Sequence, residues 1–319
     1  MKKQLFFITL LLLTVFACAQ KKPLKVACVG NSITYGYGIE NREQNSYPSV
    51  LQRQLGKSYE VENFGHSGAT LLSKGHKPYI QQEEYKKALA FAADIVVIHL
   101  GINDTDPRNW PNYRDDFVKD YLFLIASFKK ANPKARILIA RMTPLAHRHK
   151  RFESGTRDWH AEIQEAITMV ARESQAQLID FHTPLYPYPQ LLPDGLHPNA
   201  EGAALLAKVV YSAITGDYGG LQLPAIYTDN MVLQHGQPLP IKGTANTGTK
   251  VMVSIGKQKF SAVADASGLG VKSKTLENDA DVETALKAVK FDGELKVQAA
   301  SITEFLSAYK GLMADNDFN

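Results

Sequence analysis

Short apolar runs alternate with longer segments of helical periodicity between residues 24 and 215, and this alternation restricts the fold more than any other feature of the chain. Strands that alternate with helices form a parallel sheet with helices on both faces. The first run, Leu24 to Gly30, has the apolar density of a central strand that is buried on both sides. The other expected strands are Tyr59–Gly65, Asp94–Gly101, Ala135–Met142 and Ala176–Phe181.

Apolar residues at helical spacing mark segments that follow these runs. They are Phe117, Tyr121, Leu124, Ile125 and Phe128 in one segment, Trp159, Ile163, Ile167 and Val170 in a second, and Ala203, Leu206, Val210 and Ile214 in a third. Each set forms one face of an amphipathic helix. The sequence therefore predicts a three-layer α/β/α sandwich with a five-stranded parallel sheet over residues 21–216.

Polar residues come directly after three of the expected strands. Ser32 follows the first strand, Gly68 follows the second and Asn103 follows the third. Because parallel strands end at the same edge of a sheet, we expect these residues to lie close together, where such folds place their ligands. The ordinary alternative is that Gly30, Asn31 and Ser32 are only turn residues, which taken alone they resemble.

Asp194 and His197 supply what a serine nucleophile needs to react. They are three residues apart, so one turn can bring the carboxylate and the imidazole together. A serine requires a base, an acid that orients the base, and donors that stabilise the developing anion. Together with Ser32, Gly68 and Asn103, this pair completes such a set.

Four segments of the chain resemble the sequence blocks of the SGNH (GDSL-type) hydrolase superfamily. They are GNS at 30–32, HSG at 66–68, GIND at 101–104 and DGLH at 194–197, in family order. The resemblance implies a flavodoxin-like strand order. It also implies that Ser32 is the nucleophile, His197 the base and Asp194 the orienting acid, with an oxyanion hole made by the backbone N–H groups of Ser32 and Gly68 and the side-chain amide of Asn103.

One departure from the family pattern is visible before the serine. The family usually has aspartate there, and this chain has Asn31, which keeps the turn but removes a charge, so we expect a small effect. A G-x-S-x-G elbow is absent around Ser32, which disfavours an α/β-hydrolase fold.

The segment after residue 216 has a different texture. Residues 217–222 are expected to be a linker, and residues 223–268 show the short alternating strands of a partial β-sandwich. Within it, Thr228–Gln234 and 238–251 resemble the β-domain of sialate O-acetylesterases. Residues 269–319 have no assignment.

The two resemblances imply a serine esterase that removes O-acetyl groups from carbohydrate, with sialic acid as one candidate sugar. The alternatives are a lysophospholipase or thioesterase of the same superfamily and, less favoured, a carbohydrate-binding protein with a silent hydrolase fold. The expected partner is a small-molecule or glycan ester, and the oligomeric state is left open. No cofactor is expected.

Several further polar residues have two interpretations. Arg148 and Arg151 belong to a basic loop that is either solvated or binds an acidic sugar, and His66 either contacts substrate or stabilises its turn. Asp104 is expected to stabilise a turn, and His99 to be a hydrogen-bonded core histidine. No metal is expected, because His147-x-His149 has no carboxylate or cysteine nearby in the sequence.

The first twenty residues have the pattern of an export signal. Leu5 to Ala17 is largely apolar but too short to span a bilayer, and Cys18 completes a lipobox-like sequence. We favour a lipoprotein tethered to the membrane through lipidated Cys18, over ordinary cleavage after Ala19. Both interpretations place the mature protein outside the cytoplasm, at the periplasm or the cell surface.

Composition sets limits on partners and size. The formal charge of +4 becomes +2 without the two lysines of the leader (4 − 2), too little to form a nucleic-acid surface. The two cysteines make no disulfide framework, and Cys28 is expected to be a small buried apolar residue. A chain of 319 residues, 45% hydrophobic, can form one sizeable domain and a smaller one.

Overall fold

A computed structural model describes residues 22–150, 156–223, 238–255, 258–266, 269–275, 290–291 and 295–296. The predicted leader with Cys18 lies outside these residues, so export and lipidation stay predictions. Arg151 and the sialate-esterase-like segment Thr228–Gln234 also lie outside them.

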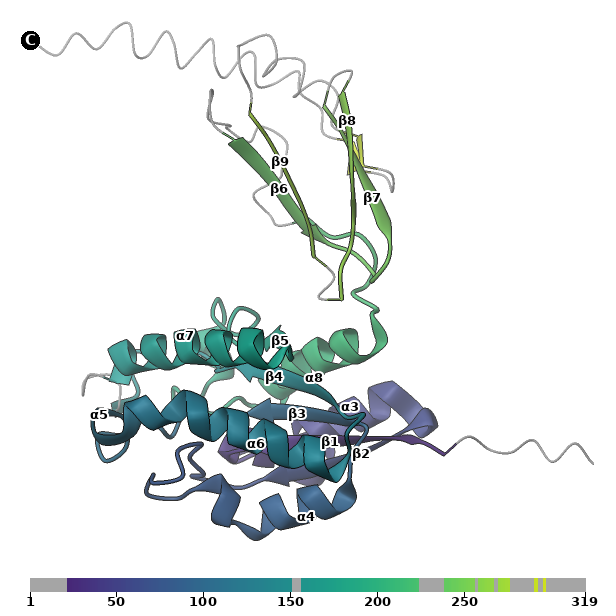
Figure 1. Ribbon diagram of the computed structural model, residues 1–319. Coiled ribbons are helices and arrows are strands. Elements are labelled where there is room, and N and C mark those ends of the chain that lie inside the picture. The colour runs from purple at the N-terminus through teal and green to yellow at the C-terminus, as the bar shows by residue number, and fades with distance from the viewer. Residues whose placement is uncertain are drawn as a thin grey trace, which may run out of the picture.

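A five-stranded parallel sheet forms the centre of the larger unit (Figure 1). Its strands are β1 (Leu24–Gly30), β2 (Tyr59–Gly65), β3 (Ile95–His99), β4 (Arg136–Arg141) and β5 (Gln177–Asp180), in the order β2-β1-β3-β4-β5. This order confirms the predicted flavodoxin-like sheet. β2 has the predicted limits, and β3, β4 and β5 are each shorter than predicted by one or two residues at either end.

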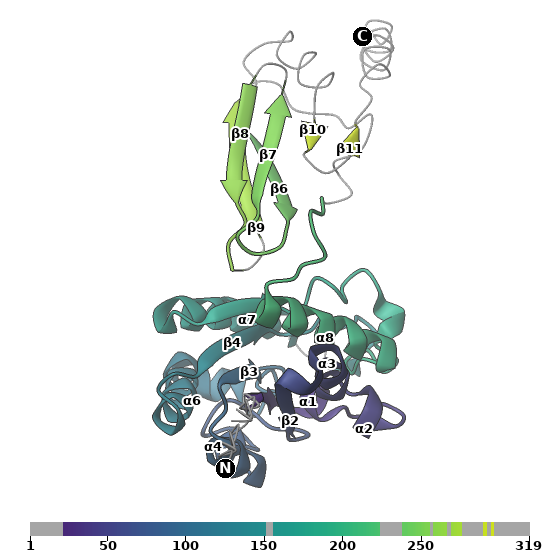
Figure 2. The same ribbon diagram turned by 90° about the vertical axis from the view of Figure 1, so that its right-hand side faces the viewer.

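Helices cover both faces of this sheet. They are α1 (Ser32–Tyr35), α2 (Arg42–Asn45), α3 (Tyr47–Leu55), α4 (Glu83–Phe91), α5 (Trp110–Tyr113), α6 (Phe117–Ala131), α7 (Thr156–Ser174) and α8 (Ala200–Thr215). Short 3₁₀ turns occur at Gly56–Ser58, Tyr79–Gln81, Arg114–Asp116 and Pro189–Leu191. Helix α6 contacts α4 and α7, whereas α3 packs against α8, so the two groups lie on opposite sides of the strands (Figure 2).

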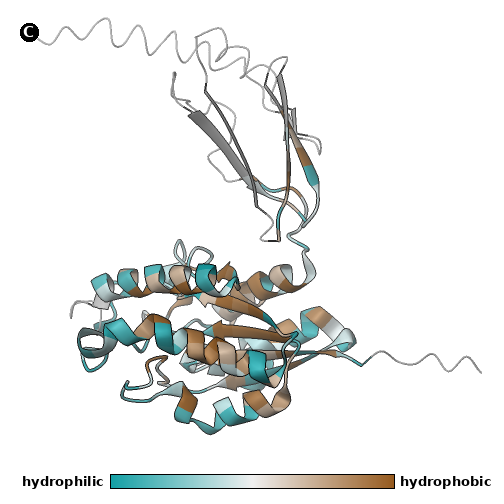
Figure 3. Cartoon of the chain, viewed as in Figure 1, coloured by the Kyte–Doolittle hydropathy of each residue, from teal (hydrophilic) through white to brown (hydrophobic). Residues whose placement is uncertain are grey.

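The core explains why these segments become helices and strands. Every predicted apolar position of α6 is buried, and so are Ile163, Ile167 and Val170 of α7. Strand β3 is buried along its whole length, as a strand between two helical layers should be. Figure 3 shows the same arrangement, with hydrophobic strands at the centre and hydrophilic residues on the outer helices. The predicted three-layer sandwich is confirmed.

The smaller unit consists of antiparallel strands. Strand β6 (Pro238–Thr244) pairs with β9 (Leu269–Thr275), and β7 (Lys250–Ile255) pairs with β8 (Gln258–Val263). Two short strands, β10 (Lys290–Phe291) and β11 (Leu295–Lys296), extend the second sheet beside β7. Strand β9 therefore shows that residues 269–275, which had no assignment from the sequence, belong to this antiparallel structure.

Candidate active site

The end of β1 presents Ser32 at the carboxyl edge of the sheet. Asn31 caps the short helix α1, because its side-chain oxygen accepts the N–H of Ile33 at 3.0 Å. Ser32 is the first residue of that helix and is 6% exposed. The asparagine that replaces the family's aspartate therefore keeps the turn. Its side-chain nitrogen is buried and has no hydrogen-bond partner among the described residues.

Two glycines let α1 lie directly on the ends of neighbouring strands. Gly30 is paired in register with Gly65 of β2 and with His99 of β3. A Cβ atom on Gly65 would lie 2.2 Å from the backbone nitrogen of Tyr35, which no side chain can tolerate. The position of Ser32 therefore depends on glycine at the end of β2.

Ser32, His197 and Asp194 form a continuous hydrogen-bonded chain. The Nε2 atom of His197 lies 2.8 Å from Oγ of Ser32, and its Nδ1 atom lies 2.6 Å from Oδ2 of Asp194. A proton on Nδ1 that bonds the carboxylate leaves Nε2 as the acceptor of the serine proton. The structure thus brings together the three residues for which the sequence predicts catalysis, although they lie up to 165 positions apart.

Asp194 is also bonded to its own turn. Its Oδ1 atom accepts the N–H groups of Leu196 at 2.9 Å and His197 at 2.7 Å. Partial burial works against ionisation, but the bonds from the His197 side chain and the two N–H groups lower the pKa of Asp194 below its ordinary value. The acid is therefore charged at neutral pH, as an orienting group for a histidine should be.

The loops that carry Gly68 and Asn103 are tied to each other. Gly68 has a φ of +81°, a conformation that glycine adopts readily. Asn103 is buried, and its side-chain nitrogen donates to the carbonyl of Ala69 at 3.0 Å. An amide side chain thus lies against the loop of Gly68, next to the end of the strand that carries Ser32. Their role in binding an oxyanion stays a prediction.

Asp104 has a wider role than the predicted stabilisation of a turn. Its carboxylate is fully buried and accepts the N–H groups of Leu71 at 2.9 Å and Leu72 at 2.8 Å. Burial raises the pKa of Asp104 to about 7, although the two backbone bonds act in the opposite direction. The residue joins the loop after β3 to the loop after β2.

Asn109 makes a second connection of the same kind, and the sequence analysis did not identify it. Its side chain donates to the carbonyl of Asn103 at 2.9 Å and accepts the N–H of His76, also at 2.9 Å. No local sequence pattern identifies Asn109, because both of these partners are backbone groups, and the N–H of His76 is 33 residues away.

Tyr37 is a further neighbour of the histidine that sequence reasoning missed. Its ring centroid lies 4.7 Å from that of His197, and the side chain is 54% exposed. The ring therefore lies beside the imidazole and forms part of the exposed surface near His197. A lone tyrosine in a glycine-rich loop gives no signal of this contact.

His66 and Arg148 each have structural partners. The Nδ1 atom of His66 lies 2.8 Å from Oε2 of Glu84, so the side chain is anchored to α4. The guanidinium of Arg148 donates to the carbonyls of Pro189, at 2.6 Å, and Leu192. These bonds tie the basic loop to the segment before Asp194. They give no support to the hypothesis that Arg148 binds an acidic sugar, which stays a prediction, as does substrate contact by His66.

His99 is a core histidine without the expected hydrogen bonds. It is fully buried against the ring of Phe181, and neither ring nitrogen has a hydrogen-bond partner among the described residues. Burial lowers the pKa of His99 to about 3, so the ring stays neutral. The prediction of a hydrogen-bonded histidine was wrong, because the side chain points into an aromatic part of the core.

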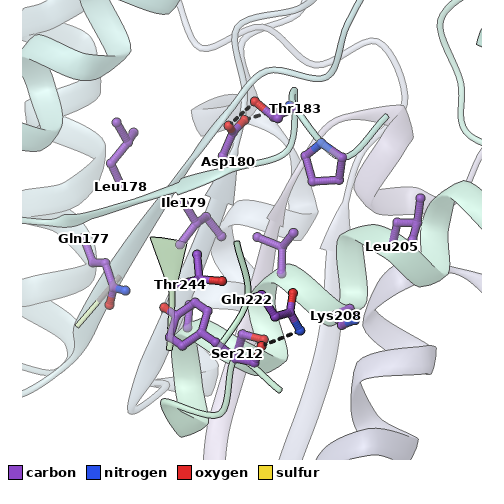
Figure 4. A pocket seen from close by; sticks show the side chains of 14 residues that line it. Gln177, Leu178, Ile179, Asp180, Thr183, Leu205, Lys208, Ser212, Gln222 and Thr244 are labelled. Carbon is purple, nitrogen blue, oxygen red and sulfur yellow. Dashed lines mark hydrogen bonds between the residues drawn. The ribbon is translucent and has the colours of Figure 1, made fainter. Parts of the chain in front are cut away.

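A cavity of about 380 Å³ lies away from the catalytic residues, between β5, α8 and the segment that leads to β6 (Figure 4). Several of its polar side chains have partners within the protein. Asp180 accepts the hydroxyl of Thr183 at 2.5 Å, and Gln222 donates to the carbonyl of Tyr218 at 3.2 Å. With its mostly apolar remainder, the cavity offers few groups that would orient a polar ligand.

The described residues also give two negative findings. No cluster of three or more His, Cys, Asp or Glu side chains among them is arranged to hold a metal ion. Within the same part of the chain, no helix combines the length and the apolar character that crossing a bilayer requires.

Comparison with known proteins agrees with this geometry. The family described as "GDSL-like Lipase/Acylhydrolase family" matches residues 28–205, more than half of the chain. The chain belongs to this family. That membership confirms the SGNH resemblance, which rested on four short segments.

Among curated proteins, this GDSL-like hydrolase is similar to "Acetylxylan esterase" from Xylanibacter ruminicola. The two are 37% identical over 207 residues, which cover 60% of this chain and 43% of the relative. The matched region is therefore less than half of the relative's length.

Solved structures with a similar fold include an acetyl xylan esterase, AlAXEase, with a TM-score of 0.48, 21% identity, and coverage of 60% of this chain and all of that one. Another is a GDSL-like lipase from Parabacteroides merdae, described there as putative, with a TM-score of 0.48 and 20% identity, covering 61% of this chain and 97% of that one.

Proposed function

We propose that this protein is a serine carboxylic-ester hydrolase that removes O-acetyl groups from carbohydrate. The observation that carries the proposal is the hydrogen-bonded chain from Ser32 through His197 to Asp194, with distances of 2.8 and 2.6 Å. A serine bonded to the free nitrogen of a histidine, which is itself held by a carboxylate, is the arrangement that activates a hydroxyl as a nucleophile.

The proposed reaction has two halves. In the first, the Ser32 oxygen attacks the ester carbonyl while His197 takes the proton of the Ser32 hydroxyl. His197 then gives this proton to the sugar oxygen as it leaves. In the second, His197 takes a proton from water as the water attacks the acetyl group on Ser32. His197 then gives that proton to the Ser32 oxygen as acetate leaves, which regenerates the serine. The N–H groups of Ser32 and Gly68 and the amide of Asn103 stabilise the oxyanion in both halves.

Two similarities support an acetylated sugar as the substrate. The relative called acetylxylan esterase aligns over 207 residues, about the length of the hydrolase unit, which favours acetylated xylan. The β-rich segment after residue 222 resembles sialate O-acetylesterases, which keeps O-acetylated sialic acid as the second candidate. Xylan is the stronger of the two, because its support covers much more of the chain.

The test is hydrolysis of p-nitrophenyl esters from acetyl to long acyl chains. We expect the largest kcat/KM for acetate and a fall with chain length. Ser32→Ala should reduce kcat about 10⁶-fold, to background. Maximal activity on long chains would instead favour a lysophospholipase or thioesterase.

Natural substrates separate the sugars. Release of acetate from acetylated xylan and from O-acetylated sialic acid should be measured with the same enzyme preparation. Faster release from xylan is expected. Binding of either glycan by wild type without any hydrolysis would contradict the proposal and favour a silent carbohydrate-binding protein.

A further inference from the structure

The predicted oxyanion donor Gly68 lies in a tight turn whose central peptide can take two orientations. The N–H of Ala69 donates to the carbonyl of His66 at 3.1 Å, which closes a four-residue turn. Gly68 is the third residue of this turn and has a φ of +81°, the value of a type II turn. Types I and II differ mainly by a flip of the central peptide, here the Ser67–Gly68 peptide.

Lys77 holds the carbonyl of that peptide. Its Nζ atom donates to the carbonyl oxygen of Ser67 at 3.0 Å. Its own carbonyl accepts the N–H of Thr70 at 2.8 Å, so the lysine backbone is fixed beside the turn. A Cβ atom on Gly68 would lie 3.9 Å from Nζ, which places the ammonium group next to Gly68.

The ammonium group of Lys77 forms no ion pair with the carboxylates of the described residues. Lys74 of the same loop, by contrast, is paired with Asp116 at 2.9 Å. Lys77 is partly buried. When a partly buried cation donates a hydrogen bond to a peptide carbonyl, the bond is charge-assisted and polarises the peptide group.

The geometry of the peptide links this contact to catalysis. In a planar trans peptide, the C=O and N–H groups point in opposite directions. A bond that fixes the Ser67 carbonyl therefore also fixes the direction of the Gly68 N–H. Withdrawal of electrons toward the ammonium group makes the same N–H a stronger donor.

We propose that Lys77 is a positioning residue for the oxyanion hole. It holds the Ser67–Gly68 peptide in the type II orientation, so that the Gly68 N–H points at the developing oxyanion. The inference rests on the proposed esterase function, since it concerns the donor that this reaction would use. A lysine that only supported the loop would affect folding but not transition-state binding.

The kinetic test compares Lys77→Met, Lys77→Arg and the control Lys74→Met on p-nitrophenyl acetate. Lys77→Met should lower kcat/KM about tenfold to a hundredfold through kcat, with KM little changed, which is less than the ~10²- to 10³-fold cost of losing a donor altogether. Arginine keeps a cationic donor and should restore most of the activity. Lys74→Met should match wild type.

A tetrahedral inhibitor adds a measurement of the anion site itself. Phenylboronic acid forms a tetrahedral anion on a serine hydroxyl, so its inhibition constant should rise in Lys77→Met by the same factor as kcat/KM falls. An unchanged inhibition constant in a folded Lys77→Met variant would overturn the proposal. Equal losses in the methionine and arginine variants would also overturn it, because the effect would then come from the shape of the side chain and not from its positive charge.

NMR of the labelled Ser67–Gly68 peptide gives an independent readout that does not require catalysis. Serine labelled with ¹³C at the carbonyl and glycine labelled with ¹⁵N give signals for the three Ser–Gly pairs of the chain, at 67–68, 154–155 and 267–268. The 67–68 signal, identified by its loss in Gly68→Ala, should move in Lys77→Met and stay in Lys74→Met. An unmoved signal would refute the contact.

The two arms separate the two hypotheses. A wild type that hydrolyses no acetate ester, with a 67–68 signal that still moves in Lys77→Met, contradicts the proposed function but supports the contact of Lys77 with the peptide. An active wild type with normal kinetics in Lys77→Met contradicts the inference alone.

Discussion

The catalytic edge and the domain junction are held together in different ways. The catalytic edge comprises the loops at 31–37, 66–79 and 100–110, and the turn at 194–197. Its loops are joined by buried side chains that bond distant backbone groups, as Asp104 does to Leu71 and Leu72. At the junction, formed by 216–222 with 244–247 and Ala266, the bonds lie nearer to solvent. The backbone groups of Gln222 and Thr244 bond each other at 2.7 and 2.8 Å, and the exposed hydroxyl of Tyr218 bonds the carbonyl of Ala266.

This difference shows in which region the positions of the loops are fixed most strictly. A buried side chain that loses its partner leaves an unsatisfied polar group, which is costly, so the loops it joins have one favoured arrangement. Exposed groups at the junction can exchange a partner for water at little cost. We therefore expect substitutions of the catalytic residues and of the side chains that join these loops to change activity or pH behaviour. Substitutions of exposed side chains elsewhere, including those at the junction, should change little.

Among the substitutions that compare the two regions, the largest effect is expected for Asp194→Asn at the catalytic edge. Asparagine keeps the shape of the turn but no longer selects the histidine tautomer that accepts the serine proton, so kcat should fall about 10⁴-fold. Steady-state kinetics on p-nitrophenyl acetate would measure it. Asp180→Asn is a matched control. Asp180 also accepts the backbone N–H groups of the residues two and three positions after it, but among the described residues no histidine ring is hydrogen-bonded to its carboxylate. A fall below tenfold in Asp194→Asn would mean that His197 works without the acid.

An intermediate effect is expected for Asp104→Asn, and it concerns stability against pH. The pKa of Asp104 in the folded protein is raised to about 7 from an ordinary 3.8, so the folded state holds a proton that the unfolded state has lost between these values. The free energy of unfolding should therefore decrease as pH rises from about 4 to about 7, by up to about 4 kcal/mol. Asparagine does not titrate, so the variant should lose this slope.

Urea unfolding at a series of pH values would measure the slope. Asp120→Asn is the control, because Asp120 accepts the N–H of Ser73 in the same loop at 2.7 Å while Asp104 remains in place. An identical slope in wild type and Asp104→Asn would show that this carboxyl group is not the source.

The smallest effect is expected for Tyr218→Phe at the junction. The Tyr218 hydroxyl donates to the carbonyl of Ala266 at 2.9 Å on an exposed surface. Its removal should change the free energy of unfolding by less than about 1 kcal/mol and leave kcat/KM on p-nitrophenyl acetate unchanged. A loss of activity comparable to that of Lys77→Met would remove the distinction between the two regions.

The sequence by itself determined the five strands, the helices α6, α7 and α8, and the three residues of the hydrogen-bonded chain. Apolar spacing along the chain marked α6 and α8, because burial on one side requires that periodicity. Asp194 and His197 were recognisable as a pair because they lie three positions apart, within one turn. Ser32 was recognisable because a buried strand stops at a glycine just before it.

Only the tertiary structure decided which polar groups fix the loops around that serine. Lys77 bonds Ser67, Asp104 bonds Leu71 and Leu72, and Asn109 bonds Asn103, through contacts that span 6 to 33 residues. The His99 nitrogens, expected to be bonded, have no partner among the described residues. Such contacts depend on which loops the sheet order brings together, and no periodicity in the chain encodes the direction of a single polar side chain.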